Sequence, residues 1–95
     1  MGHLRYNSMI QSDKPEWLLW LQVEIRGYVS LGMEDTPEAW MDLQDFADAC
    51  IRRLYNRRDI MVKSEVTADL QTEDGKTQLL IKRNGKTIQV YYIEK

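Results

Sequence analysis

The chain has 95 residues, of which 43% are hydrophobic and 29% are charged, and its formal net charge is −2. This length and composition indicate one globular domain with a modest core, and they argue against a disordered chain. The charge balance argues against a general nucleic-acid binder and leaves room only for a local basic patch.

The N-terminal residues 1–12 form a mixed segment. Leu4, Tyr6, Met9 and Ile10 predict either a short extra strand or an arm that covers part of the domain, and the pattern does not decide between them. The segment lacks the apolar stretch of a secretory signal peptide. No run approaches the roughly 18 apolar residues that span a bilayer. We therefore expect a cytoplasmic protein without a membrane segment.

A first helix is expected from about Lys14 to Leu31. Asp13 is placed to cap its start, Glu16 follows three residues later as in a capping box, and Pro15 is tolerated in a first turn. Gly32 is expected to follow the helix as its C′ residue.

A second helix is expected from Pro37 to about Arg58. Thr36 supplies a capping hydroxyl, and proline is favoured at the first helical position. Only four or five residues separate the two helices, which predicts an antiparallel helical hairpin.

From Ile60 the apolar residues recur with period two. Asp74-Gly75 and Asn84-Gly85 are typical of type I′ turns, which predicts a three-stranded antiparallel meander. The first turn places Leu70 opposite Leu79 and Ala68 opposite Ile81, and the second places Ile81 opposite Ile88 and Leu79 opposite Val90. The predicted core face consists of Val66, Ala68, Leu70, Leu79, Ile81, Ile88, Val90 and Tyr92. Leu80 and Tyr91 are predicted to lie on the outer face.

The resulting fold class is α+β, with an antiparallel helical hairpin packed on a three-stranded β-meander in the order α-α-β-β-β. Residues 13–95 make a single domain, and residues 1–12 make the N-terminal arm or extra strand.

The first helix is apolar on two sides. One stripe comprises Trp17, Leu18, Leu21, Ile25, Tyr28 and Val29. The second side carries Leu19, Trp20 and Val23. Two interpretations stay open. The helix is buried on both sides, with Gly27 allowing close approach, or the second side binds a protein partner or a second copy of the chain.

The second helix ends in a basic cluster. Arg52, Arg53 and Arg57, with Lys82 from the sheet, are candidates for contact with an anion or a nucleic acid. Acids at the start of this helix and bases at its end are also the arrangement that the helix dipole favours, so both interpretations stay open.

Residues that carry enzyme chemistry are sparse. Cys50 is the only cysteine, which excludes an intramolecular disulfide, and its apolar helical position indicates a core residue. His3 is the only histidine, which excludes a His-based triad or a His-rich metal site. We expect no catalytic residue, metal or cofactor.

These observations predict a small non-enzymatic protein-interaction module, an adaptor, regulator or inhibitor, that self-associates as a homodimer. The alternative is a nucleic-acid-directed protein. The order of two helices and a meander over residues 14–93 is similar in outline to the RelE/ParE-type ribonuclease toxins. This resemblance implies RNA cleavage by Arg52, Lys82, Arg83 and Tyr91.

Overall fold

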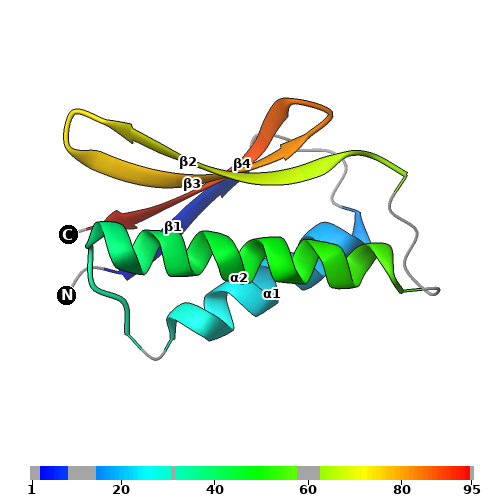
Figure 1. Cartoon of the computed structure of the whole chain (residues 1–95), viewed down its shortest axis with the longest axis horizontal. Coiled ribbons are helices and arrows are strands. Elements are labelled where there is room, and N and C mark those ends of the chain that lie inside the picture. The colour runs from blue at the N-terminus through cyan, green and yellow to red at the C-terminus, as the bar shows by residue number, and fades with distance from the viewer. Residues whose placement is uncertain (1–2, 9–14, 31, 58–62, 95) are drawn as a thin grey trace.

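The structure is a computed structural model that describes residues 3–8, 15–30, 32–57 and 63–94. Its elements, in chain order, are β1 (His3–Ser8), α1 (Glu16–Val29), α2 (Pro37–Tyr55), β2 (Val66–Glu73), β3 (Lys76–Arg83) and β4 (Lys86–Glu94). A helical hairpin covers one face of an antiparallel sheet, which confirms the α+β class (Figure 1).

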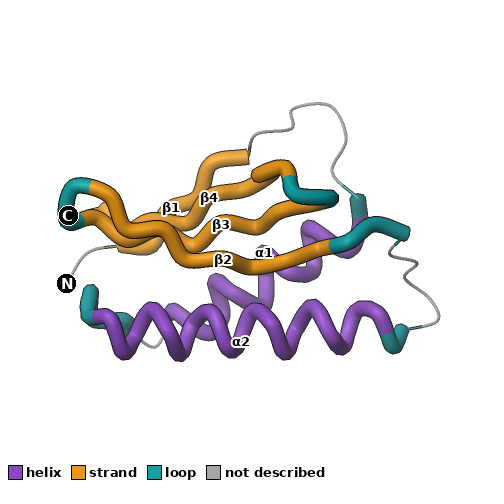
Figure 2. The backbone as a smooth tube through the Cα atoms, turned by 45° about the horizontal axis from the view of Figure 1, so that its top comes forward, coloured by secondary structure: helices purple, strands orange, loops and turns teal. Residues whose placement is uncertain are grey.

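The sheet has four strands in the order β1-β4-β3-β2, because the N-terminal segment pairs antiparallel with β4. This confirms the extra-strand interpretation, and Met9 and Ile10 lie outside the described residues. Helix α2 runs along β2 at one edge of the sheet (Figure 2). Helix α1 lies nearer the other edge, where the Arg26 guanidinium is 5.7 Å from the centre of the Tyr6 ring.

Helix α2 begins as predicted. The Thr36 hydroxyl accepts a hydrogen bond from the Ala39 amide at 3.2 Å, and Pro37 is the first helical residue. The helix ends at Tyr55, before the expected end at Arg58, with Asn56 as its C-cap. Arg58 itself lies outside the described residues.

Helix α1 begins later than predicted, at Glu16, with Pro15 at its N-cap and no side-chain cap. The helix starts at Glu16 because the Pro15 backbone is extended, with φ −62° and ψ 153°. Asp13 and Lys14 lie outside the described residues. At the other end the helix stops at Val29 with Ser30 as its C-cap, so the prediction of Gly32 as the C′ residue is wrong, and Leu31 lies outside the described residues. Gly32 has the left-handed φ of 99° that favours glycine.

Both hairpin turns form as predicted. Asp74 and Asn84 each have φ 54°, and each is followed by a glycine with positive φ, as a type I′ turn requires. The register of β2 with β3 is confirmed, with Leu70 opposite Leu79 and Ala68 opposite Ile81. Strand β2 begins only at Val66, and the earlier positions Ile60 and Val62 lie outside the described residues.

The register of β3 with β4 differs from the prediction. Lys82 pairs with Thr87, but Ile81 pairs with Gln89, so Ile88 is an extra residue in β4. Such a β-bulge shifts everything beyond it by one position. The predicted pairs of Ile81 with Ile88 and of Leu79 with Val90 are therefore wrong.

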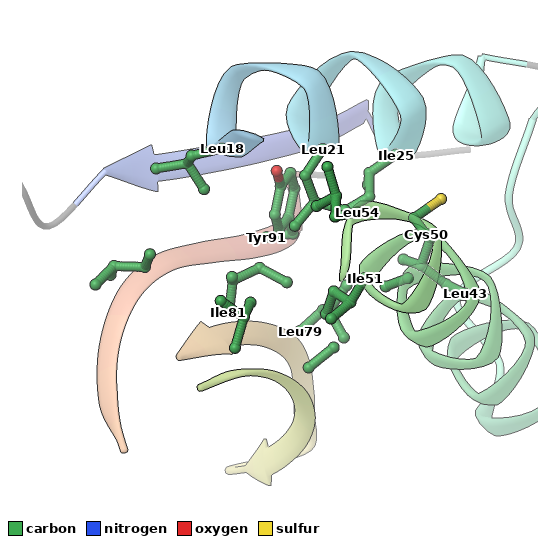
Figure 3. Packing of buried hydrophobic residues seen from close by; sticks show 14 of the residues in the cluster. Leu18, Leu21, Ile25, Leu43, Cys50, Ile51, Leu54, Leu79, Ile81 and Tyr91 are labelled. Carbon is green, nitrogen blue, oxygen red and sulfur yellow. The ribbon is translucent and has the colours of Figure 1, made fainter. Parts of the chain in front are cut away.

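The bulge exchanges the two faces of β4. Tyr91 was predicted to be on the outer face but is fully buried between the sheet and α1 (Figure 3). Val90 and Tyr92 were predicted to face the core, and they lie on the outer face, where Val90 pairs with Leu80. Leu80 and Val90 are nevertheless only 8% exposed.

The core lies between the helical hairpin and the inner face of the sheet (Figure 3). Its buried residues are Trp17, Leu18, Leu21, Ile25, Trp40, Leu43, Ala47, Cys50, Ile51, Leu54, Val66, Ala68, Leu79, Ile81, Ile88 and Tyr91.

Candidate interaction surface

Helix α1 buries one of its two apolar sides and exposes much of the other. Leu19 is 44% exposed and Val23 is 68% exposed, whereas Leu18, Leu21 and Ile25 are fully buried. The interpretation that the helix is buried on both sides is therefore wrong for Leu19 and Val23. The structure leaves an apolar face on α1 that none of the described residues covers.

Gly27 lies one turn beyond Val23, at the same four-residue spacing from Val23 as Val23 from Leu19. A Cβ atom added at Gly27 would meet no described atom within 4 Å. The expectation that Gly27 allows close packing inside the domain is thus wrong, because the glycine faces open space.

Trp20 links this face of α1 to the end of α2. Its ring is half buried, and the guanidinium carbons of Arg53 and Arg57 lie 5.5 Å and 5.7 Å from its centre. Arg53 also lies 3.7 Å from the Glu24 carboxylate. The predicted partner-binding and anion-binding residues therefore contact each other, because the antiparallel hairpin puts the start of α1 beside the end of α2.

We call Leu19, Trp20 and Val23, with Arg53 and Arg57, the α1 patch. An arginine over the face of an indole ring is held by a cation–π interaction and buries its aliphatic stem. Trp20 therefore already packs against the core and two guanidinium groups of the chain itself.

Cys50 lies beneath the α1 patch. Its thiol is buried and accepts a hydrogen bond from Arg53 Nη2 at 3.4 Å. Burial raises the pKa of the thiol, and the hydrogen bond to Arg53 only partly opposes this. Because nucleophilic cysteines need a lowered pKa and access to solvent, this geometry supports the prediction of a core residue.

Two of the predicted anion-binding residues lie apart from the α1 patch. Arg52 is exposed, and its charge acts on Asp48 of the preceding turn. Lys82 lies on the outer face of the sheet and forms a 3.2 Å ion pair with Asp69.

The residues that the toxin resemblance implies are also separated. Tyr91 is fully buried, and its hydroxyl donates a 2.6 Å hydrogen bond to Gln89 Oε1. Burial raises its pKa. Lys82 lies on the opposite face of the sheet, so these two side chains cannot act on one substrate.

Many charged residues of the described chain lie near the two ends of the molecule, with more acids at one end and more bases at the other. Asp35 lies close to the β2–β3 turn and the end of β4, since all three line one cleft. We call this end the acidic pole (left in Figure 1). Its acidic residues are Glu34, Asp35, Glu38, Asp42, Glu73, Asp74 and Glu94, and Arg5 and Lys76 are the bases among them.

The other end joins the C-terminus of α2 to the start of β2 and to the β3–β4 turn. The Tyr55 hydroxyl donates to Ser64 O and accepts from the Val66 amide, and Asn84 Oδ1 accepts from the Glu65 amide. We call this end the basic pole. Its basic residues are Arg52, Arg53, Arg57, Lys63, Arg83 and Lys86, and Glu16, Glu24 and Glu65 are the acids among them.

A cleft of about 440 Å³ opens at the acidic pole. Charges of both signs line it, and several already have partners: Asp35 accepts a bond from Trp40 Nε1 at 2.7 Å, and Glu94 pairs with Arg5 at 2.9 Å. Sequence patterns could not reveal this cleft because three separate segments form it. Its residues are Asp35, Gly75, Lys76, Thr77, Gln78, Tyr92, Ile93 and Glu94.

Comparisons of the chain with profiles of protein families, with curated proteins and with solved structures found no match. Within the described ranges, no group of three His, Cys, Asp or Glu side chains is placed to hold a metal ion. None of the helices in those ranges is both long enough and apolar enough to cross a membrane.

Proposed function

We propose that the chain is a small non-enzymatic protein-interaction module, an adaptor, regulator or inhibitor in the cytoplasm, that binds a partner protein through the α1 patch. The observation that carries the proposal is the exposure of Leu19 and Val23 beside an oriented Trp20. Tryptophan and arginine are enriched among residues that dominate binding energy, and apolar neighbours exclude water around them.

The patch is organised before binding. Trp20 packs against the core and under two guanidinium groups, so binding would immobilise little that is not already ordered. Immobilising a flexible side chain costs about 0.5–1.5 kcal/mol. Gly27, with open space around it, lets the backbone of a partner approach α1 closely.

Affinity capture from the source cells tests this proposal. The bait proteins are the wild type, the double variant Leu19→Ser/Val23→Ser, and the control Met41→Ser, which removes an equally exposed apolar side chain from α2. We expect a partner that the wild type and the control recover and the double variant loses. Recovery of the same proteins by all three folded baits would contradict a role for the α1 patch.

A second candidate function is nucleic-acid contact through the basic pole. The observation in its favour is that three segments bring Arg52, Lys63, Arg83 and Lys86 to one end of the molecule. Binding to phosphates would weaken steeply as salt rises. Fluorescence anisotropy with generic RNA and DNA would detect it, and no binding at low salt would exclude it.

A further inference from the structure

We propose that two copies of the chain form a closed, antiparallel pair in which their α2 helices lie side by side and the basic pole of each copy meets the acidic pole of the other. The contact centres on the exposed stripe of α2. The stripe shares no residue with the α1 patch, although the basic pole beside it includes Arg53 and Arg57, and the inference does not rest on the proposed function.

The first support is that the charge separation extends beyond the helix. The dipole of α2 accounts for acids in its first turn and bases in its last turn. It does not account for Glu73 and Asp74 at one hairpin turn or for Arg83 and Lys86 at the other. These two turns point toward opposite ends of the sheet and carry opposite charge (Figure 1). The whole molecule is therefore bipolar.

The second support is the length of α2. The molecule measures 37 × 24 × 18 Å. The 19 residues of α2 span about 28 Å at 1.5 Å per residue, so the helix reaches from one pole to the other. An antiparallel pair along α2 joins both pairs of opposite poles at once, whereas a parallel pair would bring like charges together.

The third support is the order of residues on the exposed stripe. A twofold axis level with Ala47 places Asp42 of one copy opposite Arg52 of the other and Glu38 opposite Asn56. Ala49, near the middle of the stripe, is exposed and small, so the two helices can approach closely. The stripe comprises Glu38, Asp42, Asp45, Ala49, Arg52 and Asn56, and all of them are exposed.

A closed pair is favoured over an open chain of copies. Head-to-tail contact between the ends would also join opposite poles, but it would leave one pole uncovered at each end and would continue to grow. The stripe on α2 holds both signs of charge on one face. Two copies related by a twofold axis therefore pair their acidic and basic side chains with each other, and this face cannot bind a third copy.

A charge-swap experiment tests the pair. The masses of wild type, Asp42→Arg and Arg52→Asp would be measured by sedimentation equilibrium in low salt, alone and as an equimolar mixture of the two variants. Each variant alone creates two like-charge contacts across the axis, and we expect its association to weaken about tenfold or more. In the mixture both contacts become complementary, so we expect a heterodimer about as stable as the wild-type pair.

Two controls complete the design. Arg26→Glu reverses an exposed charge on α1 that lies in neither pole and away from the stripe, and we expect it to dimerise like the wild type. The double variant Asp42→Arg/Arg52→Asp restores opposite charges within one chain, so we expect it to recover the homodimer even if each single variant is less stable.

Several results would overturn the proposal. These are a wild-type monomer at millimolar concentration, single variants that dimerise like the wild type, a mixture that stays monomeric, and masses that keep growing with concentration. Loss of the dimer in Leu19→Ser/Val23→Ser but not in the charge variants would also overturn it, because self-association would then use the α1 patch. Loss of partner capture without loss of the dimer would concern only the proposed function.

Discussion

Gln89 is a polar residue whose environment is decided by the bulge in β4. Its side chain is fully buried, Oε1 accepts the Tyr91 hydroxyl at 2.6 Å, and Nε2 has no partner among the described residues. A glutamine at this position would be solvated if β4 followed the regular alternation. The bulge at Ile88 turns it inward together with Tyr91.

We predict that Gln89 and Tyr91 are energetically coupled. Tyr91→Phe leaves Gln89 Oε1 buried without a donor, and an unsatisfied buried group costs about 1–3 kcal/mol. Gln89→Met likewise leaves the Tyr91 hydroxyl without its acceptor, but it also removes the unpaired Nε2. The double variant removes both polar groups, so urea unfolding should show a loss smaller than the sum of the single losses. Additive losses would contradict the coupling.

We also predict a pH effect from Asp48. Burial raises the pKa of this carboxyl above its ordinary value of 3.8, and Arg52 only partly opposes the shift. The folded chain thus holds this proton more tightly than the unfolded chain, so the stability contribution of Asp48 is present at low pH. It is lost as the pH rises from 3.8 through the higher folded value.

Asp48→Asn removes this titration. In urea unfolding series at several pH values, the stability of the variant relative to the wild type should therefore increase as the pH rises through that interval, and then stay level. A difference that does not change with pH, or that decreases, would contradict the raised pKa.

The orientation of single residues was the least predictable level of this structure. A two-residue turn fixes the pairing only until the next irregularity, and no local pattern marks Ile88 as the extra residue of a bulge. For that reason the inward orientation of Val90 and Tyr92 was predicted wrongly. Leu79 and Ile81, whose orientation also rests on the regular β2–β3 pairing, were predicted correctly.

Among the elements, the β3–β4 turn does more than reverse the chain. Asn84 accepts a 3.0 Å hydrogen bond from the Glu65 amide through Oδ1, and its own amide donates to Glu65 O at 2.7 Å. The turn thereby fixes the start of β2, next to the end of α2.

Asn84→Ala should therefore destabilise the domain more than Asp74→Ala. Both changes put alanine at the same φ of 54°, so both carry the backbone strain of the left-handed region. Only Asn84→Ala also loses the bond to Glu65, which adds about 0.5–1.5 kcal/mol to the free energy lost. Urea unfolding measures the difference, and faster hydrogen exchange at the Glu65 amide would locate it. Equal losses would show that the side-chain bond contributes nothing.

Helix α1 offers a test of whether Gly27 is retained for folding. Because its surroundings are empty, Gly27→Ala should stabilise the domain by about 0.5–1 kcal/mol, the usual difference between the two residues inside a helix. Ala49→Gly, on the exposed side of α2, is the matched control and should lose a similar amount. A destabilised Gly27→Ala in thermal unfolding would mean that the glycine serves the fold.

The helices themselves were well predicted, because 3.6-residue periodicity and the Thr36-Pro37 start are local signals. The contact of Trp20 with Arg53 could not be predicted in the same way. It depends on how α1 is offset along α2 and on the rotation of each helix, and both are set by packing against the sheet rather than by neighbours in sequence.

At the scale of the whole molecule, the basic and acidic poles are a product of the fold. In the sequence only the arginines that end α2 form a run, and the near-neutral net charge hides the separation. The poles form when β2, β3 and α2 align and their ends meet. The fold thereby converts scattered charges into two patches, separated along a long axis of 37 Å.

Ionic strength should have different effects on self-association through the poles and on partner binding through the α1 patch. Contacts between opposite poles involve exposed charges, and the Debye length falls from about 10 Å at 0.1 M salt to about 3 Å at 1 M. Self-association measured by sedimentation equilibrium should therefore weaken steadily across this range. Binding of a captured partner through Leu19 and Val23 is apolar and should persist in the same buffers. Self-association that strengthens with salt would assign it to an apolar contact, and would then contradict pairing through the poles.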